Sequence, residues 1–233
     1  MPQVTGIGRD TVGDAEGGAA LASWTPGVVE RWRPAAFAVD PWTVLRLARY
    51  RRREAVPPVV WEAAGAMAAR VAELGEPLAL LQPLRVAAAG PEGARLADGT
   101  VFSGRGVGRL LEGCPLAAAF VLTLGPRLEA ETAALAERRE LLEAFLLDTA
   151  GWAAIERAVR ALRLDLAGRA RADGWRVTHR LAPGYQDWPL AEQRGLVGLF
   201  GGAGGLVRLS EHGVLVPFKS VSGLFGLRPA RGG

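Results

Sequence analysis

Lysine, cysteine, isoleucine and asparagine are scarce or missing in this 233-residue sequence. Lys219 is its one lysine, Cys114 its one cysteine, isoleucine occurs only at Ile7 and Ile155, and asparagine does not occur. A single cysteine excludes an internal disulfide and any zinc site built from several cysteines. Because lysine, asparagine and isoleucine are read from A/T-rich codons, their scarcity indicates a G/C-rich genome.

A large excess of charge is also missing. The sequence has 28 basic and 24 acidic residues, a net charge of +4, and 27 of the basic residues are arginine. Arginine stays protonated at any physiological pH, so the isoelectric point near 10.1 reflects arginine content more than charge imbalance. A net charge of +4 with acidic residues interleaved gives little support for a nucleic-acid-binding surface, and we expect no such partner.

Long apolar runs are absent as well. The longest, such as Pro115 to Leu124, are about ten residues, too short to cross a bilayer. The first twenty residues contain three acids and no apolar stretch, so no secretory signal is visible and we expect a cytoplasmic protein without a membrane partner. Residues 1–22 are predicted to be a flexible N-terminal arm, and residues 23–233 a single globular domain.

Helical and strand patterns are mixed along the chain, which favours an α+β fold over alternating βαβ units. Asp40-Pro41 predicts a helix N-cap followed by proline at the first helical position. Further helices are predicted over 57–74, stopped at Gly75, and over 107–111, 126–172 with a break near 137–140, and 189–200. Strands are predicted over 78–86, 117–124 and 176–181, with a hairpin over 95–102 turned at Asp98-Gly99, a glycine turn over 201–205 and β-rich structure over 206–227.

The second helix of the 126–172 segment has a predicted apolar face. Helical spacing relates Leu142, Phe145, Leu146, Trp152, Ala153 and Val159. Two polar residues, Thr149 and Glu156, fall on the same face.

Several common kinds of site find no support in the sequence. The glycines at 6–8 and 201–205 do not follow a predicted strand, so loops are favoured over a dinucleotide site. His179 and His212 have no metal-ligand pattern beside them, and no G-x-S-x-G motif is present. Cys114 precedes a proline and a buried strand, which favours a structural role. We assign no catalytic residue and no metal ligand.

The first informative stretch runs from Val177 to Gln193. Its centre is Arg180-Leu-Ala-Pro-Gly-Tyr185, in which Arg180 is predicted to end a strand and Pro183-Gly184 to make a tight turn. The planar guanidinium of arginine suits a carboxylate, Tyr185 can stack on a base or face a cation, and Gly184 allows close approach to the main chain. Either a ligand site or an ordinary strand, turn and helix cap would explain the pattern.

The second stretch runs from Leu209 to Gly226, with small polar residues following Pro217. It contains Lys219, the one lysine in a sequence whose other basic residues are all arginine. Two explanations stay open: a functional lysine, or a chance survivor on a solvated edge strand.

Together the two stretches resemble a family. Arg180-x-Ala-Pro-Gly-Tyr185, with Leu209-Ser-Glu and Pro217-x-Lys-Ser-Val-Ser-Gly223, is similar to the activation (S-adenosylmethionine-binding) domain of cobalamin-dependent methionine synthase. The short stand-alone branch of that family is the closer match, and the resemblance covers about residues 40–227. Full-length enzymes have Cys-Pro-x-His after Pro-Gly-Tyr, whereas this sequence has Gln-Asp-Trp-Pro.

The resemblance implies a twisted antiparallel sheet with surrounding helices, and S-adenosylmethionine as ligand. It implies that Arg180 binds the ligand carboxylate and that Ala182, Gly184 and Tyr185 make main-chain and ring contacts. An acid on the long helix would face the ligand amino group, and Glu156 and Asp148 are the candidates. Glu156 is equally well explained as an acid at the edge of the apolar face that reaches solvent. The residues expected to face the corrinoid or its carrier are Lys219, Ser220, Ser222 and Gly223.

The family reactivates an oxidised corrinoid by reduction and methyl transfer from S-adenosylmethionine. This sequence lacks the corrinoid signature Asp-x-His-x-x-Gly, so the resemblance implies that a separate corrinoid-binding protein or methyltransferase supplies cobalamin. A flavodoxin- or ferredoxin-type protein would supply the electron. A non-catalytic accessory protein that keeps the fold and binds a partner or another small ligand is the alternative.

Overall fold

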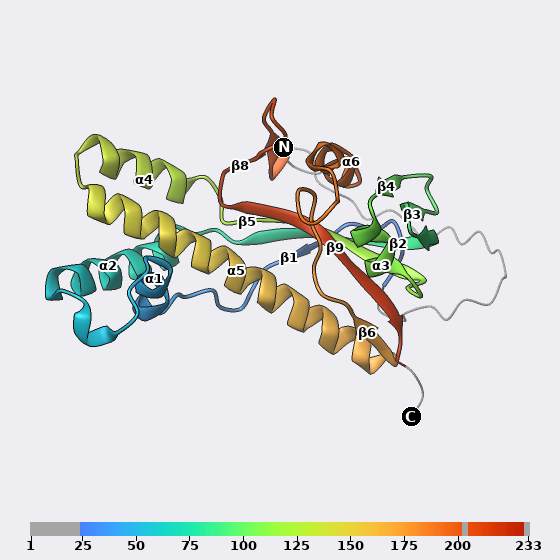
Figure 1. Cartoon of the computed structure of the whole chain (residues 1–233), viewed down its shortest axis with the longest axis horizontal. Helices are drawn as coiled ribbons and strands as arrows, with labels where there is room; N and C mark the ends of the chain where they lie inside the picture. Colours follow the sequence, from blue (N-terminus) through green and yellow to red (C-terminus); the bar gives the residue numbers. More distant parts are fainter. Residues whose placement is uncertain (1–23, 202–204, 231–233) are drawn as a thin grey trace, which may run out of the picture.

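One antiparallel sheet organises the chain in a computed structural model that describes residues 24–201 and 205–230. Seven strands form it in the order β4-β3-β2-β5-β9-β6, and β1 also pairs with β2 (Figure 1). The strands are β1 (Glu30–Trp32), β2 (Leu78–Gly90), β3 (Gly93–Leu96), β4 (Val101–Ser103), β5 (Leu116–Thr123), β6 (Trp175–Val177) and β9 (Ser220–Pro229). A separate two-stranded ribbon joins β7 (Arg208–Leu209) to β8 (Leu215–Val216).

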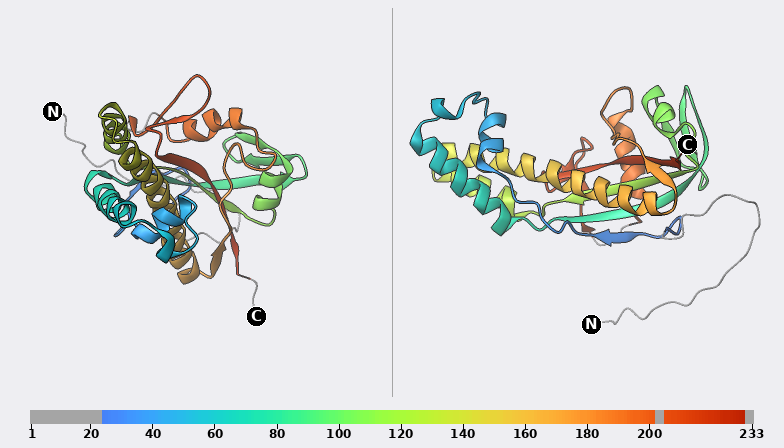
Figure 2. Two further views of the ribbon diagram at one scale, coloured as in Figure 1. Left: turned by 60° about the vertical axis from the view of Figure 1, so that its left-hand side comes forward. Right: turned by 90° about the horizontal axis from the view of Figure 1, so that it is seen from below.

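Helices cover both faces of this sheet, which confirms the expected α+β architecture. One face carries α1 (Pro41–Leu47), α2 (Pro58–Leu74), α4 (Arg127–Glu137) and the 32-residue α5 (Leu141–Ala172). The other carries α3 (Arg105–Leu111) and α6 (Gln193–Gly198). Figure 2 shows α5 running along the sheet with α1 and α2 beside its first half. No helix among the described residues is both long enough and apolar enough to cross a membrane.

Strand β5 lies at the centre, and all eight of its residues are buried. Phe120 and its even-numbered neighbours face the core shared with α5, whereas Val121 and its odd-numbered neighbours face the core shared with α3 and α6. A strand buried on both faces needs apolar residues throughout. This explains the continuous apolar run that the sequence shows there.

Most predicted element boundaries are confirmed. The Asp40 carboxylate accepts a hydrogen bond from the Thr43 backbone N–H at 3.1 Å and so caps α1. The break between α4 and α5 falls at residues 138–140, inside the predicted range. Helix α2 ends at Gly75 as expected, but Gly75 has φ −72° and is therefore not a left-handed cap. Its side-chain position is instead occupied by the ring of Phe37.

Two predictions in the second half of the chain are wrong. The strand predicted over 176–181 ends at Val177, so Arg180 lies in a connection and not at a strand end. Phe145 and Trp152, which lie on the predicted apolar face of the helix, are 54% and 38% exposed. The buried stripe of α5 is made largely of small residues such as Ala150 and Ala154, which let the helix pack closely, and the aromatic residues are displaced to its flank. The predicted arm over 1–22 and the centre of the glycine turn lie outside the described residues.

Helix α3 packs against the β2–β3 hairpin with no room for a side chain at Gly108. A Cβ there would lie 1.7 Å from the carbonyl oxygen of Gly90. We expect Gly108→Ala to lower the free energy of unfolding by about 1–3 kcal/mol, as overpacked sites do. Gly168→Ala is the control, because Gly168 is helical, exposed and has nothing within 4 Å of the added atom.

Urea unfolding measures both variants. The control should gain about 0.5–1 kcal/mol from the better helix former. A similar gain at Gly108 would contradict the packing described.

Candidate functional site

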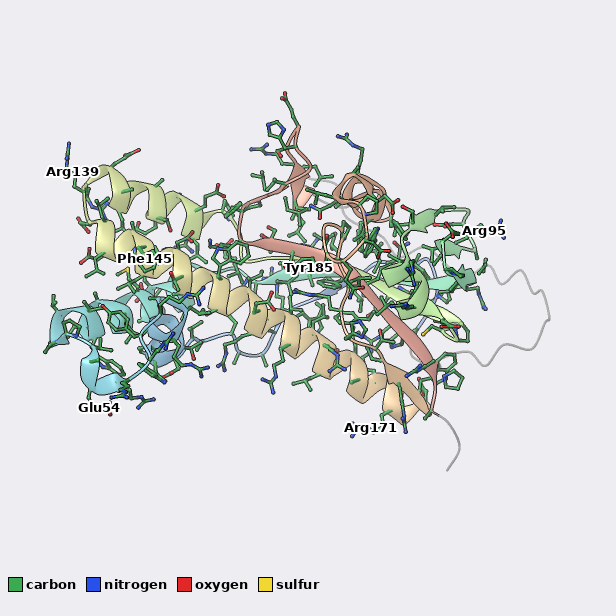
Figure 3. The ribbon with its side chains drawn as sticks, in the orientation of Figure 1. Glu54, Arg95, Arg139, Phe145, Arg171 and Tyr185 are labelled. Carbon is green, nitrogen blue, oxygen red and sulfur yellow. The ribbon has the colours of Figure 1, made fainter. Side chains whose placement is uncertain are left out.

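The two sequence stretches meet at a pocket beside β9. The cavity has a volume of about 200 Å³. Five of the predicted site residues line it, namely Arg180, Ala182, Tyr185, Ser220 and Ser222. Tyr185 is 62% exposed at the pocket, and Figure 3 shows it beside β9. Residues 180–185 and 220–222 are far apart in the sequence, so the fold is what joins them.

A close approach between Leu181 and β9 sets this geometry. Leu181 and Leu224 exchange two backbone hydrogen bonds, at 3.1 and 2.8 Å. A Cβ at Gly223 would lie 2.6 Å from the carbonyl oxygen of Leu181 and 3.3 Å from Cγ of Arg180. Gly223, expected to face a partner, is buried here and does not line the pocket. Its missing side chain lets the Arg180 segment lie against the sheet.

The Pro-Gly-Tyr turn continues from this contact. Gly184 has φ +86°, a conformation that favours glycine, and its N–H donates to the carbonyl of Trp188 at 2.8 Å. The N–H of Tyr185 donates to the carbonyl of Ala182 at 3.1 Å. Gly184 is therefore a turn residue next to the pocket, while Ala182 and Tyr185 line it.

Asp187 and Trp188 fasten the turn to the rest of the domain. The Asp187 carboxylate accepts backbone N–H bonds from Arg105 at 2.7 Å and Gly106 at 2.8 Å, at the N-terminus of α3. The Gly106 bond, followed by the Arg105 bond, lowers the pKa of Asp187. Trp188 is 1% exposed, and its indole N–H donates to Glu192 at 2.9 Å.

Arg180 and Glu156 form an ion pair at this site. Arg180 Nη2 donates to Glu156 Oε1 at 3.1 Å. The second terminal nitrogen of Arg180, Nη1, is buried and has no hydrogen-bond partner among the described residues. The Glu156 side chain is 56% exposed and reaches solvent, as expected if Glu156 is an acid at the edge of the apolar face. The other explanation, a contact with a ligand amino group, stays a prediction.

Lys219 and Asp148 form a second ion pair, whose Nζ and Oδ1 atoms are 2.6 Å apart. Lys219 is only 3% exposed, so the explanation as a solvated edge residue is wrong. Its buried ammonium lies 4.5 Å from the ring centre of Trp152 and 5.1 Å from that of Phe218. These two rings pack edge to face at 5.6 Å and line the pocket.

Ser220 and Ser222 are also buried, at 7% and 3% exposure. Ser220 Oγ bonds to Thr123 Oγ1 at 2.7 Å, and Ser222 Oγ lies 3.4 Å from Gln193 Oε1. Both serines line the pocket wall, and their expected contact with a corrinoid partner stays a prediction.

No family model and no curated protein sequence matches the chain. A crystal structure of the MetH reactivation domain bound to AdoHcy superposes on it with a TM-score of 0.61. The match covers 91% of this chain and 83% of that one, at 13% sequence identity.

The chain has the MetH reactivation domain fold. This confirms the fold expected from the two motifs. Among residues 24–201 and 205–230 of this reactivation-domain fold, no three His, Cys, Asp or Glu side chains gather in a way that could hold a metal ion. Cys114 is buried beneath β9, and burial raises the pKa of its thiol, which fits a packing role.

The sequence patterns do not assign several of the residues that line the pocket to the site, among them Trp152, Phe218 and Gln193. Trp152 is predicted on the apolar face of its helix because helical spacing does not distinguish a buried face from the flank beside a pocket. Gln193 is 7% exposed and donates to the carbonyl of Gly213 at 2.8 Å, which ties α6 to the β7–β8 turn. Trp152 and Glu156 lie four positions apart on α5, and the helical spacing places both on one face of the helix, as predicted from the sequence.

The Asp187 contact predicts a pH-dependent stability. The folded pKa is lowered, so the carboxylate stabilises the fold above the ordinary pKa of aspartate, about 4. That contribution is lost as the pH falls from there through the lowered pKa. Asp187→Asn should therefore be less stable than wild type at pH 7, and the difference should shrink below pH 4.

Urea unfolding at pH 7, 5 and 3 measures the difference. Asp165→Asn, at an exposed position of α5, is the control. A difference between Asp187→Asn and wild type that stays constant across this range would contradict the assignment.

Proposed function

We propose that the pocket binds S-adenosylmethionine (AdoMet) and its product S-adenosylhomocysteine (AdoHcy), and that the domain serves a separate corrinoid methyltransferase as a reactivation module. One observation carries the ligand assignment. Arg180 Nη1 is buried at the pocket without a hydrogen-bond partner among the described residues. An unsatisfied buried donor costs about 1–3 kcal/mol, and a ligand carboxylate would remove that cost.

The charges beside Arg180 suit an amino acid as a whole. Glu156 lies 3.1 Å from the guanidinium and is more than half exposed, so it can accept a hydrogen bond from a ligand ammonium. A carboxylate on Arg180 and an ammonium on Glu156 would recognise a zwitterion. Both AdoMet and AdoHcy carry such an amino-acid end.

The rest of the pocket suits the nucleoside. Trp152 and Phe218 form an aromatic wall, and buried hydroxyls of Ser220 and Ser222 lie beside it. Aromatic faces stack on planar bases. The structural neighbour described above was crystallised with AdoHcy, which supports the same ligand class on this fold.

The surroundings of the pocket support a protein partner. Tyr185, Leu190, Val214 and Phe218 all line it and are 62%, 44%, 40% and 47% exposed. Exposed apolar side chains gathered around one opening are typical of a docking surface. When bound, AdoMet supplies a methyl group activated by its sulfonium, and these residues would hold it facing the partner's corrinoid. Holding the donor in one geometry is how such a domain accelerates transfer. A flavodoxin- or ferredoxin-type reductant belongs to the same proposal.

Titration calorimetry with AdoMet and AdoHcy tests the ligand assignment. The wild type should bind both, and Arg180→Ala should weaken binding by about 10- to 150-fold, the range for a lost charged hydrogen bond. Arg171→Ala is the matched control, because Arg171 is exposed in the last turn of α5 and does not line the pocket (Figure 3).

Unchanged affinity in Arg180→Ala would contradict the role of the guanidinium. Absence of any binding to the wild type would contradict the proposed ligand and favour an accessory protein with another partner.

A further inference from the structure

The side chain of Lys219 lies beneath the aromatic wall and packs against Gly151 of helix α5. A Cβ at Gly151 would lie 2.9 Å from Lys219 Cε, 3.3 Å from Cδ and 3.4 Å from Cγ. Glycine inside a helix costs about 0.5–1 kcal/mol relative to alanine. Gly151 carries this cost, and the side chain that it lacks leaves room for the buried aliphatic stem of Lys219.

The end of the side chain is equally well defined. Its ammonium lies 2.6 Å from Asp148 Oδ1 and within about 5 Å of the ring centres of Trp152 and Phe218. Cations at such distances are attracted to aromatic faces, by about 2 kcal/mol or more where they are desolvated. Asp148, with a side chain 44% exposed, balances the charge.

We propose that Lys219 is a positioning residue that fixes Trp152 and Phe218 as the aromatic wall, while Asp148 keeps that wall electrically neutral. The two rings already face a cation, so they attract a second cation less. The wall therefore receives the flat, uncharged ring of the ligand and not its cationic centre. This inference rests on the proposed function, because it concerns the same pocket and ligands.

The paired charges predict opposite effects on ligand preference. AdoMet carries a positive sulfonium where AdoHcy has a neutral thioether, so the ratio of their affinities reports the charge near the pocket. Lys219→Met removes the cation and leaves Asp148 unbalanced, which should shift the ratio toward AdoMet by about three- to tenfold. Asp148→Asn leaves the ammonium unbalanced and should shift the ratio toward AdoHcy. The double variant should return close to the wild-type ratio.

Calorimetry with both ligands on these four proteins measures the ratios. A purely structural role would weaken both ligands equally and leave the ratio unchanged in every variant, which would overturn the proposal. Shifts of the same sign in the two single variants would overturn it as well. Gly168→Ala is the control for helix α5, and its ratio should equal that of the wild type.

A second measurement needs no ligand. In protein labelled with 5-fluorotryptophan, the ¹⁹F resonance of Trp152 is identified as the line that is missing from the spectrum of the Trp152→Phe variant. It should be one sharp line in the wild type, and it should move or broaden in Lys219→Met and in Gly151→Ala, which displaces the lysine. An unchanged line in both variants would overturn the positioning role.

The two proposals fail differently. If the wild type binds neither ligand, the proposed function fails, and the inference about ligand preference fails with it. The ¹⁹F spectra then still decide whether Lys219 positions Trp152. If the wild type binds both ligands but the ratios do not shift, only the inference fails.

Discussion

The contact between Leu181 and Leu224 determines where everything else in the site lies. Two backbone hydrogen bonds hold the segment that follows β6 against β9, and they form because Gly223 has no side chain to keep the segment away. Arg180 precedes this contact and Ala182 follows it, so both residues lie at the pocket beside β9. The Asp187 contact with α3 then fixes the far end of the turn. The segment is thus held at two points, by backbone hydrogen bonds to β9 and by the Asp187 carboxylate at the N-terminus of α3.

Helix α5 supplies three side chains of the site from positions at regular spacing. Asp148, Trp152 and Glu156 are four positions apart and therefore lie along one face of the helix. Asp148 pairs with Lys219 of the second motif, and Glu156 pairs with Arg180 of the first. Each motif thus contributes one cationic side chain, and α5 contributes the acidic side chain that pairs with it. The buried nitrogen of Arg180, which has no hydrogen-bond partner in the part of the chain that the structure describes, is what favours an anionic group on the proposed ligand.

Local signals made much of this predictable from the sequence. The Asp40 cap, the break between α4 and α5 and the buried run of β5 depend on neighbouring residues, and all were expected. The resemblance of the two motifs also indicated the fold and five residues of the pocket wall.

Long-range contacts explain what was missed. Phe145 and Trp152 share the helical period of the core, and only the packing of small residues of α5 on the sheet decides that they face outward. The burial of Lys219 depends on Gly151, 68 positions earlier, which no local pattern relates to it. Gly223 likewise supports a long-range backbone contact, with Leu181, and its expected position facing a partner stays a prediction.

The central claim is that Arg180 recognises the amino-acid end of an adenosyl ligand. The most direct measurement compares the affinities of AdoHcy and 5′-methylthioadenosine, which shares the nucleoside and the sulfur but lacks the amino-acid end. The wild type should prefer AdoHcy by at least about tenfold, and Arg180→Ala should lose most of that preference by weakening AdoHcy alone. Equal affinity of the two ligands for the wild type, or an undiminished preference in the variant, would contradict the claim.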